Sequence, residues 1–574
     1  MQLSFLAAAG PLPLREELDS QLRHGAGSLV RLFRSDRLSL WGEAGTPLLH
    51  DDDAVSVGLM FDRATGTGRT RLPDAIMRAE AIIRDSWGAY VLFDCHDASG
   101  HSVLRDPSGS IPVYYGAANG LDLYASDSEM LRLGWTESFE PNLDAVRQWL
   151  TLPFLRTRMT GTVGVSELLP GSLREVRNNR ARERQMWSPG RFTGTPAAVR
   201  NLAEAADLLR EEILRTVRLL AAGERVVLRL SGGLDSSIVA AALARAGIDF
   251  RAITFATNSR DGDERRFARE VASHCGIRLR ELDEGALNFS FQPATDPLRR
   301  PSNPILQPLR HAFAAASSEE RGASLILDGG GGDNVFGSLN TAAPVIDAFL
   351  ARGLREAFSA LRDIAGLHGC TLWEAGRSAA RRWRRRSGVT WPEERSFLRA
   401  PAAGEHFDVH PWLADAQGVL PASAEHIRII AGAHHFLEDP RPGEPVGLHP
   451  LLAQPVVELC LRIPSWFWVS GGRDRAVARA AFRGLVSNAI IDRRSKGTLE
   501  SMFLKVYMAK RSELRELLVA GRLADEGIVD PGSIKSYLDR DEQPRDSAYI
   551  RILEIASAEQ WLRSFGTRAN LPLP

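Results

Sequence analysis

The chain has 574 residues, of which 44% are hydrophobic and 25% are charged, a balance typical of globular proteins. Basic and acidic residues number 71 each, so the net charge gives no general argument for binding nucleic acid or a membrane surface. No run approaches the ~20 apolar residues of a membrane helix, and the absence of a CxxC pair argues against a zinc site or a disulfide framework. We therefore expect two or three domains, a cytoplasmic location and a first β-strand, rather than a signal peptide, within residues 1–10.

Residues 1–190 carry short apolar runs separated by Gly, Pro and Asp. Such runs predict a strand-rich α+β domain, with a helix at about 74–86. The stretch at 187–196 (WSPGRFTGTP) is rich in turn residues and predicts a linker, so we place a second domain at 200–574. The clearest strand candidates are 54–61, 89–93 and 112–115.

The second domain opens with helical periodicity at 202–222. Strands and helices then alternate, which predicts a doubly wound parallel sheet. From about residue 345 onward the chain is predicted to be mostly helical. The predicted elements between these points are strand 226–230, loop 231–237, helix 237–246, strand 251–257, helix 263–274, strand 277–282, helix 308–321 and strand 324–328.

The loop at 231–237 (SGGLDSS) lies between a buried strand and a helix start, at the end of a parallel sheet where ligands bind. Its glycines allow backbone N–H groups to face an anion, and the helix N-terminus adds partial positive charge. Asp235 is predicted to hold Mg²⁺, which takes oxygen ligands and bridges phosphates. The predicted nucleotide-binding residues of this loop are Ser231, Gly232, Gly233, Leu234, Asp235, Ser236 and Ser237.

This loop resembles the pyrophosphate-binding loop of N-type ATP pyrophosphatases, and its SGGLDSS form is most similar to that of asparagine synthetases. The segment 328–337 (DGGGGDNVFG) resembles the second acidic segment of that family, usually SGEGxDExFGG. The resemblance implies that Asp333 shares Mg²⁺-pyrophosphate with Asp235 and that Gly331 and Gly332 contact the nucleotide.

Two further segments support the same family. Residues 261–269 (DGDERRFAR) resemble its helix start after the second strand, although acidic residues are also ordinary in a first helical turn. Residues 493–497 (RRSKG) resemble its late basic loop. The resemblance implies that Lys496 is the catalytic lysine, which neutralises charge on the α-phosphate and the tetrahedral intermediate, and that Arg494 contacts ATP.

The first domain resembles class II glutamine amidotransferase (Ntn) domains. Residues 105–115 (RDPSGSIPVYY) and 125–129 (ASDSE) carry that resemblance. Such domains use an N-terminal cysteine as nucleophile, whereas residue 2 here is Gln2 and the first cysteine is Cys95, inside an apolar strand. Without an activated nucleophile there is no route to ammonia from glutamine, so the domain is expected to be inactive and to serve structure or docking.

Two departures from the family motif concern the incoming nitrogen. Gly330 stands where the family motif has a glutamate, and Asn334 stands where the motif has an acidic residue after the metal-binding aspartate. Loss of the glutamate removes a charge and is expected to open space for a larger amine, such as a peptide N-terminus. The base that accepts the amine proton is left open between water, the peptide itself, His434 and His435, and a structural role is also open for both histidines.

Relatives with an inactive first domain include β-lactam synthetases and lasso peptide cyclases. The chain resembles the cyclases at 449–455 (HPLLAQP), 461–466 (LRIPSW) and 471–475 (GGRDR). A β-lactam synthetase is expected to use a Tyr–Glu pair as base, and residues 310–470 contain no tyrosine.

The resemblance implies a lasso peptide cyclase that uses ATP and Mg²⁺ to form a macrolactam. Such an enzyme is expected to act on a precursor peptide and to require a separate leader-binding protein and a leader peptidase. Neither a nucleic-acid partner nor a membrane span is expected. The alternatives are an ammonia-dependent asparagine synthetase, another small-molecule amide ligase such as a β-lactam synthetase, and a non-enzymatic paralogue. The basic run 381–386 (RRWRRR) is either a solvated helix face or a docking patch for an acidic partner.

Overall fold

The computed structural model describes residues 3–25, 29–74, 77–95, 100–135, 138–193, 199–257, 259, 262–286, 298, 300, 306–320, 322–384, 389–400, 407–437, 445–494, 497–540 and 542–568. Within these ranges, no helix combines the length and apolar character that a membrane crossing requires.

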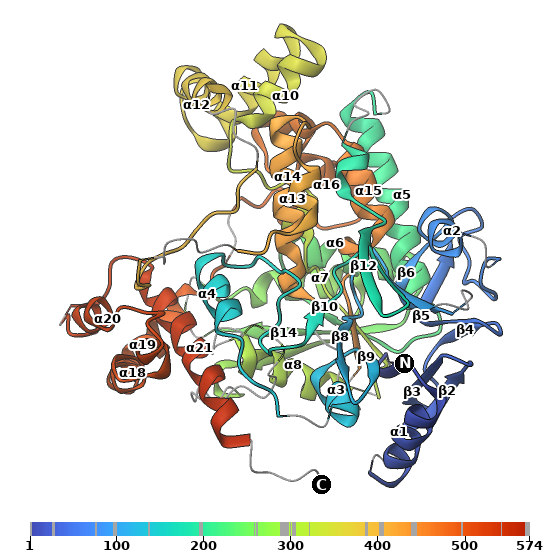
Figure 1. Ribbon diagram of the computed structural model, residues 1–574. Coiled ribbons are helices and arrows are strands. Elements are labelled where there is room, and N and C mark those ends of the chain that lie inside the picture. The colour runs from blue at the N-terminus through green and yellow to red at the C-terminus, as the bar shows by residue number, and fades with distance from the viewer. Residues whose placement is uncertain are drawn as a thin grey trace.

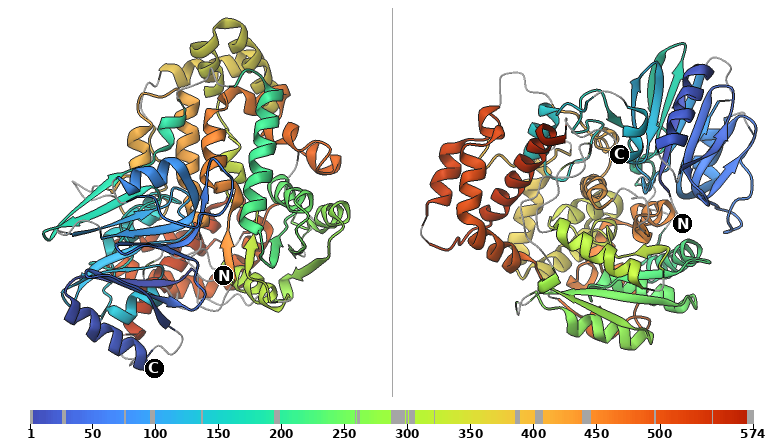
Figure 2. Two further views of the ribbon diagram at one scale, coloured as in Figure 1. Left: turned by 90° about the vertical axis from the view of Figure 1, so that its right-hand side faces the viewer. Right: turned by 90° about the horizontal axis from the view of Figure 1, so that it is seen from below.

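Two six-stranded antiparallel sheets form the N-terminal part of the molecule (Figures 1 and 2). The first sheet contains β1 (Phe5–Ala9), β2 (Leu29–Arg34), β3 (Leu38–Glu43), β8 (Tyr114–Ala118), β9 (Leu121–Ala125) and β10 (Ser166–Glu167), in the order β10-β8-β9-β1-β3-β2. The second contains β4 (Leu48–His50), β5 (Ala54–Asp62), β6 (Ser86–Asp94), β7 (Gly100–Arg105), β11 (Ser172–Arg177) and β12 (Arg180–Gln185), in the order β12-β11-β7-β6-β5-β4.

The two sheets pack face to face because alternate residues of each strand point into a shared core. The rings of Phe5 in β1 and Phe93 in β6 lie 5.5 Å apart across this interface. Helices α1 (Leu12–Gly25) and α3 (Ser128–Gly134) cover the outer face of the first sheet, and α2 (Arg78–Asp85) covers that of the second. This four-layer arrangement confirms the predicted strand-rich α+β domain.

A five-stranded parallel sheet forms the centre of the C-terminal part. Its strands are β13 (Val226–Arg229), β14 (Phe250–Ala256), β15 (Leu279–Asp283), β16 (Leu325–Leu327) and β17 (Val446–Leu448), in the order β15-β14-β13-β16-β17. Helices pack on both faces, as predicted for a doubly wound sheet. They are α5 (Leu202–Ala221), α6 (Leu234–Arg245) and α7 (Arg265–Cys275) on one face and α8 (Leu306–Glu319) on the other.

The rest of the C-terminal part is mostly helical, except for β17 at the edge of the sheet. One group, which projects at the top of Figure 1, consists of α10 (Ala343–Arg352), α11 (Leu354–His368) and α12 (Leu372–Arg384). A second group consists of α18 (Glu500–Val519), α19 (Arg522–Asp525), α20 (Pro531–Leu538) and α21 (Ala548–Arg568). The shorter elements are α9 (Gly332–Val335), α13 (Pro411–Asp415), α14 (Pro421–Ala433), α15 (Gln454–Arg462), α16 (Ala476–Ala481), α17 (Asn488–Ile491), η1 (Pro189–Phe192), η2 (Glu284–Ala286), η3 (His434–Phe436), η4 (Pro450–Leu452) and η5 (Ser465–Gly472).

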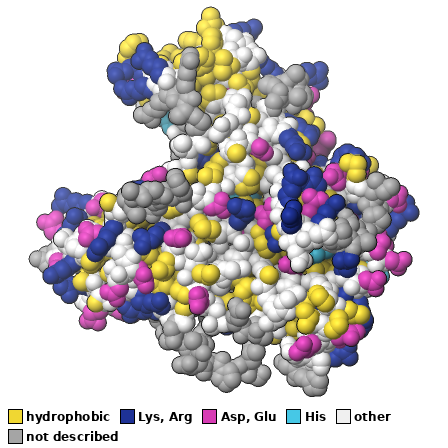
Figure 3. Space-filling model, viewed as in Figure 1, with side chains coloured by type: hydrophobic (Ala, Val, Ile, Leu, Met, Phe, Trp, Pro, Cys, Tyr) yellow, Lys and Arg dark blue, Asp and Glu magenta, His cyan; other side chains and the backbone are white. Residues whose placement is uncertain are grey.

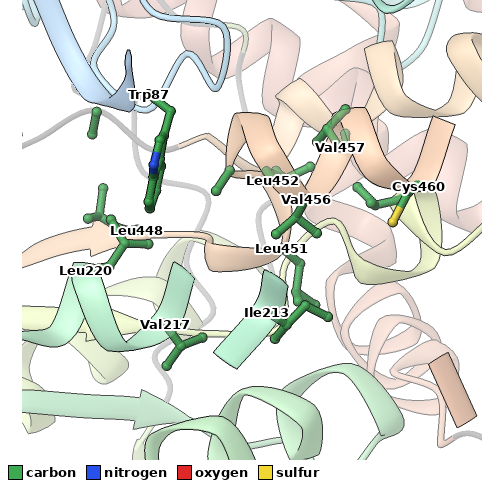
Figure 4. Packing of buried hydrophobic residues seen from close by; sticks show 14 of the residues in the cluster. Trp87, Ile213, Val217, Leu220, Leu448, Leu451, Leu452, Val456, Val457 and Cys460 are labelled. Atoms are coloured by element: carbon green, nitrogen blue, oxygen red, sulfur yellow. The ribbon is translucent and has the colours of Figure 1, made fainter. Parts of the chain in front are cut away.

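Hydrophobic packing continues across the boundary between the two parts. Trp87 of β6 belongs to the same core as Leu220 of α5 and Leu448 of β17, and Figure 4 shows its ring directed toward them. Helix α4 (Leu143–Thr151), within residues 1–190, packs into the second helical group, where the rings of Trp149 and Trp561 lie 5.3 Å apart. The N-terminal part is therefore built into the C-terminal part on two sides.

Candidate active site at the carboxyl edge of the parallel sheet

The carboxyl ends of β13, β16 and β17 lie side by side. Leu228 of β13 pairs with Leu327 of β16, which in turn pairs with Leu448 of β17. Because all three strands are parallel, the segments that follow them emerge at the same edge of the sheet. These segments are the SGGLDSS loop, the glycine-rich segment from Asp328 and the HPLLAQP segment from His449.

The SGGLDSS loop turns directly into α6. The helix begins at Leu234 with Gly233 as its N-cap, three residues earlier than predicted, so Asp235 and both serines belong to its first turn. The Ser237 hydroxyl donates to the carbonyl of Gly233 at 2.7 Å, and the Ser236 hydroxyl lies 3.1 Å from that of Ser231. These hydrogen bonds fix the loop at the N-terminus of α6, where the partial positive charge of the helix favours an anion such as phosphate.

The run of glycines after β16 brings the second aspartate against the first. A Cβ placed on Gly332 would lie 2.5 Å from Cγ of Asp235, a distance that only glycine avoids. The backbone of α9 therefore passes directly over the side chain of Asp235 and carries Asp333 to the same place. The glycine run is thus explained by close packing rather than by a flexible loop.

Arg475 joins the two aspartates. Its Nη1 lies 3.1 and 3.0 Å from the carboxylate oxygens of Asp235 and also donates to Oδ1 of Asp333. Its Nε donates to Asp474 at 2.8 Å. Burial by itself lowers the pKa of Arg475, but the charges of Asp235, Asp333 and Asp474 outweigh it and raise the pKa. One largely buried guanidinium therefore contacts both carboxylates and balances their negative charge.

The donor set of Asp235 and Asp333 fits Mg²⁺. Oxygens of both carboxylates converge on a single nitrogen, which marks a point where one small cation can contact both. No group of three or more potential metal-binding side chains is found in the described part of the chain. Two carboxylates suffice for Mg²⁺, because it takes its other ligands from substrate phosphates and water.

The late basic loop approaches the site through Glu264. Glu264 pairs with Arg493 and accepts a hydrogen bond from the backbone N–H of Gly497 at 2.5 Å. The Arg493 guanidinium lies 3.6 Å from the centre of the Phe267 ring. These contacts hold Arg493 and Gly497 against the start of α7, in the DGDERRFAR segment that follows β14.

The predicted roles of two residues of that loop stay predictions. Arg494 is exposed, and its contact with ATP stays a prediction. Lys496 lies outside the described residues, and so does Asp261 of the DGDERRFAR segment. Sequence reasoning did not single out Arg475 or Glu264, although GGRDR had been noted as a family resemblance.

The structure gives Asn334, His434 and His435 structural contacts. The amide of Asn334 donates to the carbonyl of Ile429 at 2.6 Å. The ring of His434 lies 4.6 Å from that of Trp412, in a small cavity between the two parts of the molecule, and burial holds its pKa well below the usual range. Nδ1 of His435 lies 2.5 Å from the carbonyl oxygen of Gly432, and burial lowers the pKa of His435 to about 4.

The RDPSGSIPVYY segment of the N-terminal domain is buried and structural. Arg105 donates to Glu167 and to the carbonyl oxygens of Leu168 and Gly109, each at 2.7 Å. Burial raises the pKa of the Cys95 thiol to about 11, so little thiolate is present at neutral pH. Cys95 is therefore a poor nucleophile.

A family model described as asparagine synthase matches residues 208–431 and 447–563, which together make up more than half of the chain. The chain therefore belongs to the asparagine synthase family, a family of ATP-dependent amide ligases, and the family predicted from its motifs is confirmed. The match spans the SGGLDSS loop, the glycine-rich segment and the late basic loop.

Two curated proteins are similar over about half of the chain. The microcin J25-processing protein McjC of Escherichia coli is 23% identical over 313 residues, covering 53% of this chain and 54% of its own length. The carboxyethyl-arginine beta-lactam-synthase of Streptomyces clavuligerus is 26% identical over 280 residues, covering 46% and 51%. The chain spans about half the length of these relatives.

Among solved structures, a glutamine phosphoribosylpyrophosphate amidotransferase from B. subtilis matches 62% of this chain and 79% of its own, with 10% identity and a TM-score of 0.20. A superposition this weak carries no argument. The four-layer N-terminal domain and the doubly wound C-terminal sheet are instead established by the strand order and packing described above.

Proposed function

We propose that this chain is an ATP-dependent macrolactam synthetase of the lasso peptide cyclase type. It adenylates an Asp or Glu side chain of a precursor peptide and joins that carboxyl group to the peptide's N-terminal amine, releasing AMP and pyrophosphate. The observation that carries the adenylation step is the convergence of Asp235 and Asp333 beside the first turn of α6.

In the first step, an oxygen of the peptide carboxylate attacks the α-phosphorus of ATP, and the bond from that phosphorus to pyrophosphate breaks. The leaving pyrophosphate is received by the 231–237 loop, whose backbone N–H groups and helix N-terminus favour negative charge. Mg²⁺, when bound by Asp235 and Asp333, neutralises phosphate charge there. We assign to Lys496 the role of neutralising the negative charge that develops around the α-phosphorus.

In the second step, the amine nitrogen attacks the acyl-adenylate carbonyl, the bond to AMP breaks and the amine gives up a proton. The net change in the peptide is the loss of one water. The enzyme contributes chiefly by positioning, because a ring closes only when the two ends of the peptide are held together.

A peptide substrate is supported by two observations. One of the curated relatives is named as a processing protein for microcin J25. Residues 310–470 contain no tyrosine, so a Tyr–Glu base of the β-lactam-synthetase kind has no candidate there. The same proposal includes a cytoplasmic location, a separate leader-binding protein and a leader peptidase.

A small-molecule substrate is the second candidate, since the carboxyethyl-arginine beta-lactam-synthase is 26% identical over its matched region. The two candidates share the adenylation step and differ in the carboxylate and amine that are joined.

The deciding experiment measures pyrophosphate and AMP release from ATP with Mg²⁺. One arm contains aspartate and ammonium, a second carboxyethyl-arginine, and a third a candidate precursor peptide together with its processing partners. Turnover only with the peptide, giving a product lighter by one water, supports the macrolactam synthetase. Turnover in either small-molecule arm moves the enzyme to small-molecule amidation, and turnover in none contradicts the proposal.

A further inference from the structure

A histidine and an aspartate form a pair at the carboxyl edge of the sheet. Leu327 of β16 and Leu448 of β17 are the last paired residues of their strands, so Asp328 and His449 leave the sheet side by side. Nδ1 of His449 lies 2.6 Å from Oδ1 of Asp328. The same oxygen accepts a hydrogen bond from the backbone N–H of Gly330 at 2.7 Å.

The His449 ring occupies the space above Gly330. A Cβ placed on Gly330 would lie 2.6 Å from Nδ1 of His449 and 2.8 Å from Oδ1 of Asp328. The expectation that glycine at this position leaves open space is therefore corrected, because an imidazole fills it. Any larger residue at 330 would displace the His449–Asp328 pair.

The pair belongs to the same short segment as the metal-binding residues. A Cβ on Gly329 would lie 2.4 Å from the backbone nitrogen of Ser236, and Gly332 meets Asp235 in the same way. Gly330 lies between these two contacts. The backbone therefore fixes the His449–Asp328 pair next to the first turn of α6, which is proposed to receive the leaving pyrophosphate of the adenylation step.

The chemistry of the pair suits proton transfer. Burial opposes ionisation of Asp328, but the charge and hydrogen bond of His449, with the guanidinium of Arg229 4.0 Å away, lower the pKa of Asp328 to about 2. Asp328 is therefore an anion that accepts from Nδ1–H, which directs the lone pair of the ring to Nε2 and stabilises the imidazolium. His435 of η3 also interacts electrostatically with His449.

The second step of the reaction requires a base. A peptide α-amino group has a pKa of about 7.7–8.0, so it is largely protonated at neutral pH and must also lose a proton as the C–N bond forms. His434 and His435 make the packing contacts described above. His449 is instead paired with a carboxylate next to the first turn of α6.

We propose that His449, oriented by Asp328, is the general base for amide formation. The neutral amine, formed when the ammonium group has given one proton to water, uses its nitrogen electron pair to form the C–N bond. The C–O bond to AMP breaks, and the second proton moves from that nitrogen to Nε2 of His449. This inference rests on the proposed function, since it assigns a group to the second step of that reaction.

The test separates the two steps in the full-length protein. ATP–pyrophosphate exchange reports adenylation, and amide product reports the second step, both with the substrate that supports AMP formation in the assay above. The His449→Asn and His449→Ala variants are expected to keep exchange within about threefold of wild type and to lose roughly 10²–10⁴-fold in amide formation. His274→Asn is the matched control, because His274 lies on the exposed face of α7 and contacts the carbonyl of Leu485.

Two further readouts distinguish a base from a structural role. Hydroxylamine is an uncharged nucleophile at neutral pH, so hydroxamate formation by the His449 variants is expected to remain near wild type. Asp328→Asn keeps the shape of the partner but removes its charge, and it is expected to reduce amide formation less than loss of the imidazole. This variant also tests the pair should the His449 variants fail to fold.

Three results would overturn the proposal. Amide formation at the wild-type rate in the His449 variants excludes a base at this position. An equal loss of exchange and amide formation, without rescue by hydroxylamine, assigns His449 to building the adenylation site instead. Absence of exchange in the wild-type protein with every substrate contradicts the proposed function itself, and is distinguishable from the first two because it does not depend on His449.

Discussion

At the scale of single residues, the site is organised by charge. Asp235 and Asp333 come from different strand ends, and both contact the guanidinium of Arg475. Two neighbouring carboxylates repel each other unless a cation lies between them. Arg475 fulfils that role in the protein alone, at the point where Mg²⁺ is predicted to bind.

Asp235→Asn is expected to abolish pyrophosphate release while leaving the fold intact. The amide keeps the size of the side chain but is a weaker ligand for a hard cation, so the loss should exceed about 100-fold. Pyrophosphate release and circular dichroism check the two parts of this prediction. The matched control is Asp207→Asn, which removes only an exposed ion pair with Arg210 on α5. Turnover like that of wild type would exclude Asp235 as a metal ligand.

Arg475→Ala is expected to make the protein more responsive to Mg²⁺. The guanidinium and the metal compete for oxygens of Asp235 and Asp333, so its removal leaves both carboxylates for the cation. The measurement is the rise in melting temperature on adding MgCl₂ without nucleotide, which should be larger for the variant than for wild type. Arg473→Ala removes an exposed pair with Asp492 and serves as control. Equal responses in all three proteins would argue against competition at this point.

At the scale of elements, helix N-termini are capped either by the preceding residue or by a side chain from a distant part of the chain. Asn201 caps α5 within its own segment, where its side chain accepts from Glu204 N–H. The first turn of α14 is instead satisfied by Asp347 of α10, which accepts from the N–H groups of Ala422 and Ser423 at 2.9 and 3.1 Å. The first kind of cap is visible in the sequence, and the second is not.

Asp347 gives a prediction about pH. Its burial raises the pKa from the usual 3.8 to about 6, despite the hydrogen bonds from Ala422, Ser465 and Ser423, which lower it. At pH values between these two pKa values, the folded state therefore binds more protons than the unfolded state. The stability of the folded state falls as pH rises from about 4 to 6. The total effect is at most roughly 3 kcal/mol.

The Asp347→Asn variant cannot titrate, so this pH dependence should be missing from it. The melting temperature of wild type relative to the variant should decline between pH 4 and 6 and stay level above pH 6. Asp539→Asn, at an exposed pair with Arg515, should retain the wild-type slope. A constant difference between wild type and the Asp347 variant across this range would mean that Asp347 does not titrate there.

At the scale of the whole molecule, the two parts are joined by a buried polar cluster as well as by the core around Trp87. The Glu458 carboxylate of α15 accepts hydrogen bonds from Nη1 and Nη2 of Arg63, each at 2.8 Å. Trp187 and Gln454 also each donate to it at 2.8 Å. The side chain of Glu458 is only 4% exposed. The N-terminal domain, whose Cys95 is a poor nucleophile, is thus a structural part of the enzyme.

Glu458→Gln is expected to destabilise the protein by roughly 3 kcal/mol, because it leaves the guanidinium of Arg63 without its buried partner. Thermal unfolding should begin at a lower temperature and, if the two parts separate, in two steps. Arg462→Ala removes a weaker contact with Glu458, at 3.9 Å on the exposed side, and should change little. A melting curve for Glu458→Gln that overlays wild type would show that the cluster does not contribute to the junction.

The helical projection formed by α10, α11 and α12 carries several large exposed hydrophobic side chains. Figure 3 shows hydrophobic side chains over α10 and α11 beside arginines of α12. Leu354 and Trp373 are 77% and 72% exposed. Arg381 and Arg384 are exposed at the end of α12, and residues 385–388 lie outside the described residues. Both interpretations of the basic run, a solvated face and a docking patch, therefore remain.

Local pattern determined much of this protein. The alternation of strands and helices from 202 to 328 and the turn at 231–237 with Asp235 were predicted because periodicity and turn chemistry are properties of neighbouring residues. Asp333 was predicted from the resemblance of its segment to the family motif. The predicted strand ends agree with the structure to within about two residues at β13, β14 and β16.

Only the tertiary structure decided which distant residues meet. β17 has three residues, too few to show a period, and it was missed in a region predicted to be helical. The pairing of Asp328 with His449 follows from that strand, and the bridge from Arg475 to Asp235 joins residues 240 apart in the chain. Such contacts depend on strand register and on the packing of glycine against side chains, which no stretch of sequence contains by itself.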